Sequence, residues 1–129
     1  MSANQEITKT YPFEEAFNEH TTKRPASLRG RLFMGLVALQ IQRKSSTIYR
    51  LTYIETIQEK RHFGLASTAM RFLCKLADDH GVQLELCPVQ LDEKGGLNIV
   101  DLVRWYQRFG FRRIGLNDEM IRPPKREWI

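Results

Sequence analysis

The stretch Arg61-His62-Phe63-Gly64-Leu65-Ala66-Ser67-Thr68 lies between two segments whose hydrophobic patterns differ. Before it, residues 47–57 are rich in β-branched and aromatic residues, which is typical of a strand. After it, apolar residues repeat at helical spacing, namely Leu65, Ala69, Phe72, Leu73, Leu76 and Ala77. The stretch therefore connects a strand to the start of a helix, and this unit decides the fold.

A loop of this composition in front of a helix is suited to binding a phosphate group. Small residues at Gly64 and Ala66 let the backbone approach a ligand closely. The first N–H groups of the helix and the positive end of its dipole attract an anion. Arg61 adds a charge-assisted contact, and Ser67 or Thr68 adds a hydroxyl. The alternative interpretation is a glycine that merely starts a helix.

The rest of the chain predicts further elements on both sides of this unit. Residues 28–42 are predicted as one strand, with Gly30 and Gly35 as bulges, and they form a hairpin with residues 47–57. The central helix ends at Gly81. Before the hairpin we expect a short helix and a connecting segment, at residues 13–20 and 21–27. After the central helix we expect a strand at residues 82–89, a helix at 99–110 and a last hairpin formed by residues 111–115 and 120–122. The order β-β-α-β-α-β-β indicates an α/β domain with mixed strand pairing.

Composition limits the class of protein. The 129 residues, 42% of them hydrophobic, are predicted to form a single domain over residues 1–129 with one core. Cys74 and Cys87 are too few for a disulfide framework, and the histidines share no metal-ligand spacing, so we expect no metal. No apolar run is long enough to cross a bilayer, and the N-terminus lacks the pattern of a signal peptide. We therefore expect a cytoplasmic protein with no membrane partner.

The charge balance favours an anionic partner. Twenty Lys and Arg residues stand against fifteen Asp and Glu, which gives a formal net charge of +5. These cations are scattered in small groups rather than collected in one polybasic block. We therefore do not expect nucleic acid as the partner, and a basic nucleic-acid-binding or inhibitor protein is kept as an alternative class.

Two further strings point to a family. Trp105-Tyr106-Gln107-Arg108-Phe109-Gly110-Phe111 follows the next strand and helix, and Met120-Ile121-Arg122 closes the chain's last hairpin. Together with the phosphate loop, in this order, they make residues 48–122 resemble the GNAT superfamily of acetyl-CoA-dependent N-acetyltransferases. The resemblance implies a mixed, mostly antiparallel central sheet flanked by helices. It also implies transfer of an acetyl group from acetyl-CoA to a primary amine by direct attack in a ternary complex.

In that family the cofactor pyrophosphate lies on the phosphate loop, and the pantetheine arm pairs with the edge of the preceding strand, like an added strand. An N–H of that strand also polarises the thioester carbonyl. The resemblance therefore implies acetyl-CoA contacts from Ile54, Glu55, Thr56, Ile57, Arg61, His62, Phe63, Gly64, Leu65, Ala66, Ser67 and Thr68.

The resemblance also implies catalytic roles. Tyr106 matches the tyrosine that protonates the departing thiolate in many members, while the alternative is a core tyrosine on the buried stripe of its helix. Glu85 lies in a string similar to that of ribosomal-protein alanine acetyltransferases, in which the glutamate is the base. The alternative is a solvated or salt-bridged side chain where two strands separate. Glu55 is the second candidate base, unless it simply faces solvent.

The N-terminal region departs from the family pattern. It predicts one helix where the family usually has two, and that region normally walls the acceptor site. The pocket is therefore either open or completed by another subunit, as in a homodimer. The alternative function is a GNAT-like module that binds an acyl-CoA or a protein without catalysis.

Overall fold

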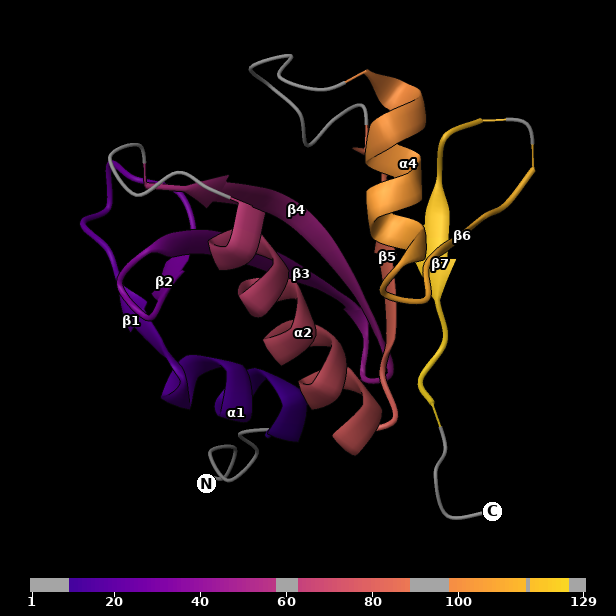
Figure 1. The fold of residues 1–129 in the computed structure, drawn as a ribbon. Helices are drawn as coiled ribbons and strands as arrows, with labels where there is room; N and C mark the ends of the chain where they lie inside the picture. Colours follow the sequence, from indigo (N-terminus) through magenta and orange to yellow (C-terminus); the bar gives the residue numbers. More distant parts are fainter. Residues whose placement is uncertain (1–9, 58–62, 89–97, 116, 126–129) are drawn as a thin grey trace.

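The computed structural model describes residues 10–57, 63–88, 98–115 and 117–125 (Figure 1). Their helices and strands, in chain order, are α1 (Pro12–Glu19), β1 (Thr21–Lys23), β2 (Arg31–Phe33), β3 (Val37–Ser45), β4 (Ile48–Thr56), α2 (Phe63–Asp79), β5 (Gln83–Leu86), α4 (Ile99–Gln107), β6 (Arg112–Arg113) and β7 (Met120–Arg122). None of these helices is long and apolar enough to span a bilayer.

The strands form one sheet in the order β1-β2-β3-β4-β5-β7-β6. Every neighbouring pair is antiparallel except β4 and β5, which run parallel. The parallel pair is joined through α2, because parallel strands need a crossover connection. The predicted mixed, mostly antiparallel sheet with flanking helices is confirmed.

The prediction of a single strand over residues 28–42 is wrong. β2 and β3 are separate strands that pair with each other, and the chain reverses at Met34 and Gly35, whose φ values are 55° and 70°. The N–H of Leu36 donates to the carbonyl of Phe33 at 3.0 Å and closes this turn. Gly35 therefore marks a hairpin turn rather than a bulge, because two successive positive φ values reverse the chain. The segment predicted as a connection also contains a short strand, β1.

The long β3–β4 hairpin contains a bulge. Leu51 pairs with Ile41 and Tyr53 pairs with Gln40, so Thr52 has no partner residue in β3. A bulge of this kind bends its strand and increases its twist. The second half of β4 therefore runs in a different direction from the first half.

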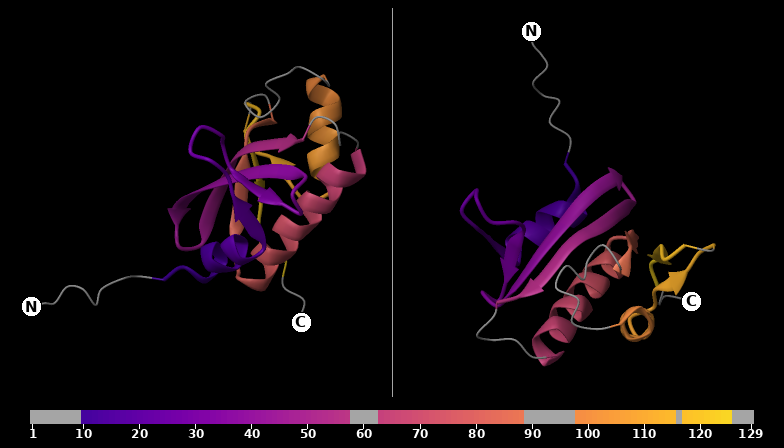
Figure 2. Two further views of the ribbon diagram at one scale, coloured as in Figure 1. Left: turned by 90° about the vertical axis from the view of Figure 1, so that its left-hand side faces the viewer. Right: turned by 90° about the horizontal axis from the view of Figure 1, so that it is seen from above.

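One core joins the helices to the sheet. Figure 2 shows α2 and α4 on the same side of the sheet, and apolar residues of α1, α2 and α4 form a single buried cluster with the strands. Its largest fully buried side chains include Tyr49, Leu73, Leu84 and Met120. The opposite side of β4 and β5 carries Arg50 and Glu85, so the two sides of the sheet differ in polarity.

The end of α2 is built as predicted at Gly81. Its φ is 65°, which glycine adopts without a side-chain clash. Its N–H donates to the carbonyl of Asp78 at 3.3 Å, and that of Val82 donates to Ala77 at 2.8 Å. This pair of bonds is a Schellman motif, which satisfies the last helix carbonyls and directs the chain into β5.

Candidate functional site

The parallel pairing of β4 and β5 ends after three residue pairs, of which Arg50 with Glu85 is the last. β4 continues to Thr56, with β3 along one edge. In the part of the chain that the structure describes, no strand pairs with the other edge of residues 51–56. This open edge of β4 presents backbone donors and acceptors that a ligand with amide groups can bind as an added strand.

The residues predicted for the pantetheine arm lie on this open edge of β4. The N–H of Ile57 donates to the carbonyl of Leu36 at 2.8 Å, so it points toward β3 and is already paired. Backbone groups alternate in direction along a strand. The N–H groups that face the open edge are therefore those of Ile54 and Thr56. The side chain of Ile54 packs against the core on the side of the helices.

The predicted phosphate loop is described from the backbone of Phe63 onward, where α2 starts. The side chain of Phe63 and the residues Arg61 and His62 lie outside the described part of the chain. Figure 1 shows the end of β4 close to the start of α2, so the open edge and the first helix amides lie at the same end of the molecule. Gly64, Leu65, Ala66 and Ser67 occupy the first turns of the helix. The hydroxyl of Thr68 donates to the carbonyl of Gly64 at 2.8 Å, so it is already used inside the helix.

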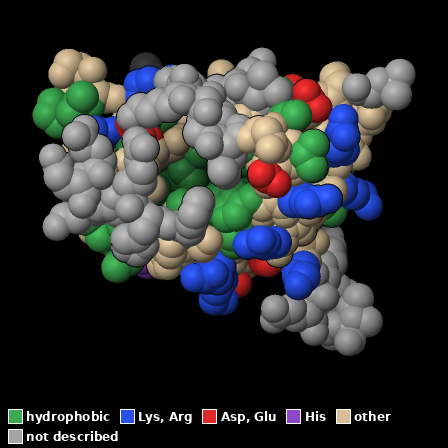
Figure 3. Space-filling model, turned by 45° about the horizontal axis from the view of Figure 1, so that its top comes forward, with side chains coloured by type: hydrophobic (Ala, Val, Ile, Leu, Met, Phe, Trp, Pro, Cys, Tyr) green, Lys and Arg blue, Asp and Glu red, His purple; other side chains and the backbone are tan. Residues whose placement is uncertain are grey.

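A hollow is visible at this end of the molecule. Figure 3 brings the top of Figure 1 forward, and hydrophobic side chains are seen in a depression at the centre of the view. An apolar depression beside exposed backbone groups is the usual character of a small-molecule site. The end of β4, the start of α2 and the start of α4 all lie in the upper half of Figure 1.

Tyr106 is buried on α4, with 2% of its surface exposed. Its ring packs edge-on against Trp105 and Phe111, with centroid distances of 4.9 and 5.9 Å. Asn98 fixes the start of this helix, because its side chain accepts a hydrogen bond from the N–H of Asp101 at 2.9 Å. The burial matches the core alternative for Tyr106, and its role as an acid stays a prediction.

Glu85 is held by cations on the polar side of the sheet. Lys44 donates to its carboxylate at 2.8 Å, Gln83 donates at 3.3 Å, and Arg50 lies 4.0 Å away. Arg50 also binds Glu119 through two hydrogen bonds of 2.9 and 3.0 Å, which lower the pKa of Glu119. The salt-bridged alternative for Glu85 therefore matches the observed contacts.

The partners of Glu85 were not predicted from the sequence. Lys44 lies on β3 and Arg50 on β4, and Arg50 reaches Glu85 only through the register of β4 against β5. No local pattern in the sequence contains that register. The alternation of residues along the two strands could at most have placed Arg50 and Glu85 on the same side.

Glu55 lies at the second half of β4 and is half-buried. The hydroxyl of Tyr53, two residues before it on the same side of the strand, donates to its carboxylate. Glu55 therefore neither points freely into solvent nor joins the cluster of Lys44, Arg50 and Glu85. It is the predicted base nearest to the open edge residues Ile54 and Thr56.

Both cysteines are free thiols. Cys74 is buried, and burial raises the pKa of its thiol to about 11, which favours the protonated form at neutral pH. Cys87 is half-buried after β5. Among the described residues, no group of three or more His, Cys, Asp or Glu side chains is arranged to hold a metal ion.

The chain was also compared with known proteins. Comparisons with protein-family models, with curated proteins and with solved structures give no match. The function is therefore inferred from the sequence motifs and from the geometry of the site.

Proposed function

We propose that this protein is a GNAT-type N-acetyltransferase, which transfers the acetyl group of acetyl-CoA to a primary amine. The observation that carries the proposal is the early end of the parallel β4–β5 pairing. Among the described residues, it leaves the edge of β4 without a strand partner near the start of α2, at the positions where the family motif places the cofactor. A binding site for an extended molecule with amides at one end and phosphates at the other needs both features.

The residues present fit acetyl-CoA by their chemistry. The N–H groups of Ile54 and Thr56 would bind the amide groups of the pantetheine arm, and the first amides of α2 would bind the pyrophosphate. Arg61 would add a cation at the phosphates. Thr68 contributes less than the sequence predicted, because its hydroxyl is bound within the helix.

The reaction requires two proton transfers. The amine nitrogen attacks the thioester carbonyl carbon, a carbon–nitrogen bond forms and the carbon–sulfur bond breaks. A base takes the proton from the amine, and an acid gives a proton to the departing thiolate. We assign the acid to Tyr106 and the base to Glu55, because cations already engage the carboxylate of Glu85.

The second candidate is a module of the same type that binds an acyl-CoA or a protein and does not catalyse. The burial of Tyr106 favours this candidate, because a core tyrosine cannot protonate a leaving group unless its hydroxyl reaches the site. A protein that binds acetyl-CoA but transfers no acetyl group to a broad panel of amines would be this module.

Thermal unfolding with and without acetyl-CoA tests the proposal, with adenosine as the control that lacks a pyrophosphate. A ligand at about 100 times its dissociation constant adds roughly 2.7 kcal/mol to the free energy of unfolding. We expect this shift in the wild type and its loss in Gly64→Val. Lys75→Val is the matched control, since it places the same side chain on an exposed position about three turns along α2. No shift with millimolar acetyl-CoA would contradict the proposal.

A further inference from the structure

A groove of about 1110 Å³ lies away from the candidate acetyl-CoA site. It runs between the second half of α2, the turn that follows α4 and the segment that follows β7. Five cationic and two acidic side chains line it. The groove therefore has an excess of positive charge.

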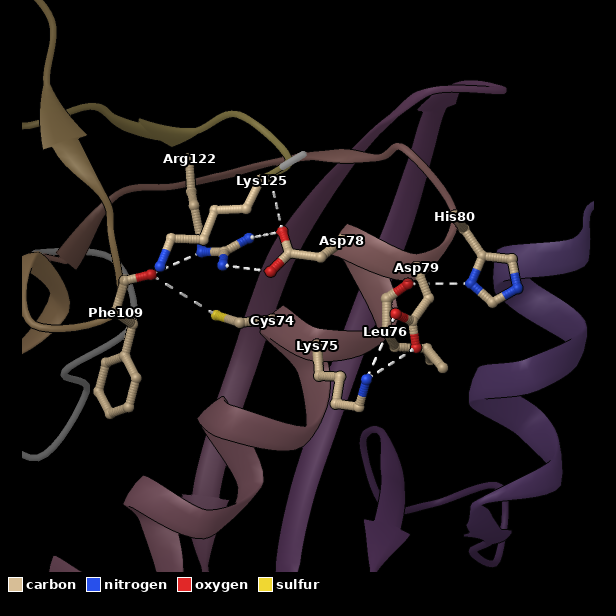
Figure 4. Close-up of polar contacts among 9 residues, drawn as sticks. All are labelled: Cys74, Lys75, Leu76, Asp78, Asp79, His80, Phe109, Arg122 and Lys125. Atoms are coloured by element: carbon tan, nitrogen blue, oxygen red, sulfur yellow. Dashed lines mark hydrogen bonds and ion pairs between the residues drawn. The ribbon is translucent and has the colours of Figure 1, made fainter. Parts of the chain in front are cut away.

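The floor of the groove is a neutral ion pair. Arg122, with 5% of its surface exposed, donates two hydrogen bonds to Asp78 at 2.8 and 2.9 Å and one to the carbonyl of Phe109. The N–H of Lys125 also donates to Asp78, at 2.8 Å (Figure 4). Burial alone would raise the pKa of Asp78, but these hydrogen bonds outweigh it and hold that pKa below its usual value. The charges of Asp78 and Arg122 therefore cancel, and the floor cannot neutralise the rim.

The rim consists of exposed cations, namely Arg71, Lys75, Arg108 and Lys125. Lys75 pairs with Asp79 at 3.4 Å, where both side chains are exposed and the pair is weak. Within the described part of the chain, the side chains of the other three make no ion pair. The nearest polar contact of Arg71 is the hydroxyl of Thr68, at 3.4 Å. Arg71 and Arg108 are therefore available to an anionic partner, while Lys75 pairs weakly with Asp79 and Lys125 also interacts electrostatically with Asp78.

The geometry points to an acidic, extended segment of another protein as the occupant of this groove. Arg71 and Lys75 are one helical turn apart, a rise of about 6 Å along α2. Side chains on one side of an extended segment repeat at about 6.6 Å. Asp or Glu at alternate positions of such a segment would therefore meet Arg71 and Lys75, while Arg108 and Lys125 hold its other side. Guanidinium groups suit this role, because they bind carboxylates through paired hydrogen bonds.

Nucleic acid fits the groove less well. Single-stranded nucleic acid binds on aromatic side chains that stack with its bases. Phe109 is the one aromatic residue among the described lining, and its ring packs edge-on against Trp105 at 5.1 Å. Figure 4 shows that ring directed away from Arg122 and Cys74. Duplex binders neutralise about 6–10 phosphates, which is more than four rim cations can supply.

Fluorescence anisotropy with the full chain tests the proposal. The probe is a labelled ten-residue peptide in which Glu alternates with Ser, and the comparison probes are the same peptide with Gln and a ten-nucleotide oligo(U) RNA. The variant Arg71→Ser with Arg108→Ser removes two rim cations. The control Lys23→Ser with Arg112→Ser removes the same charge from exposed positions outside the groove.

We expect the Glu peptide to bind the wild type and the control alike, and the rim variant to bind it about tenfold more weakly or worse. Equal weakening in both variants would show general charge attraction and overturn the proposal. Tighter binding of oligo(U), no binding of the Glu peptide, or its displacement by acetyl-CoA would also overturn it. Amide shifts in the NMR spectrum at residues 71–81 and 107–110 would support it.

Discussion

The two ends of α2 differ in how completely their polar groups are paired. At the C-terminal end, the Schellman bonds of Gly81 and Val82 satisfy helix carbonyls, and Asp78 accepts three hydrogen bonds from Arg122 and Lys125. At the N-terminal end, the helix starts beside an edge of β4 that has no strand partner among the described residues. One end is closed by the protein itself, and the other leaves backbone groups for a ligand.

This difference separates stability from function. A buried polar group that loses its partner costs free energy, so closing one end holds α2, β7 and the turn after α4 in fixed positions. At the other end, no strand of the described residues covers the edge of β4 after Arg50, so its backbone groups are available to a ligand. Changes at the closed end should alter stability, and changes at the open end should alter ligand binding and turnover.

Replacement of Tyr106, the proposed acid, has the largest expected effect. Tyr106→Phe removes the proposed acid and should lower turnover by about 100-fold or more, with acetyl-CoA binding unchanged. Initial rates of acetyl transfer and a calorimetric titration measure the two effects. If Tyr106 is only a core residue, turnover will remain at the wild-type level.

Arg122 tests the closed end. Arg122→Met leaves the half-buried Asp78 without its cation and should lower the free energy of unfolding by about 2 kcal/mol, measured in urea. The matched control is Arg113→Met, because Arg113 pairs with Asp118 at 3.2 Å on the surface and should contribute less than about 1 kcal/mol. Similar losses in both variants would mean that the closed end is not specially stabilised.

The acid dependence of stability should also report on the closed end. The pKa of Asp78 is below its usual value in the folded protein, so its contribution is present above the pKa of the unfolded chain. That contribution is lost as the pH falls through the lower, folded pKa. We expect wild-type stability to fall more steeply than that of Asp78→Asn between about pH 5 and 2. Urea unfolding across this range measures both slopes, and parallel curves would contradict the assignment.

Substitution of Glu85 gives the smallest expected change in stability. Comparing it with substitution of Glu55 distinguishes the two candidate bases. Glu85→Gln should lower the free energy of unfolding by about 1 kcal/mol, through its ion pair with Lys44, and leave turnover nearly unchanged. Glu55→Gln should instead lower turnover. The opposite result, with turnover lost only in Glu85→Gln, would assign the base to Glu85.

Local patterns predicted the elements that are held by short-range rules. The helical spacing from Leu65 to Ala77, the stop at Gly81 and the last hairpin at Met120–Arg122 are all present. Each depends on hydrophobic periodicity or on a glycine conformation, and both can be recognised from residues that are close together in the sequence. The helix predicted at residues 13–20 is present at Pro12–Glu19 for the same reason.

The failures came from pairing between distant residues. Residues 28–42 are apolar enough to be interpreted as one strand, but the positive φ of Met34 lets Gly35 turn the chain back on itself. β1 is a strand because β2 supplies its partners, from Thr21 with Phe33 to Lys23 with Arg31. A polar segment such as Thr21–Lys23 has no hydrophobic pattern that would predict this pairing.

The amino-acid sequence by itself determined the order of most helices and strands, and it marked the strand–loop–helix unit that resembles a cofactor site. Only the tertiary structure decided that β4 and β5 separate after Arg50, that cations bind Glu85, and that Arg122 closes the end of α2 on Asp78. The physical reason is the distance along the chain over which each kind of interaction acts. Propensities and caps act over a few residues, whereas strand register and buried ion pairs join residues that are tens of positions apart.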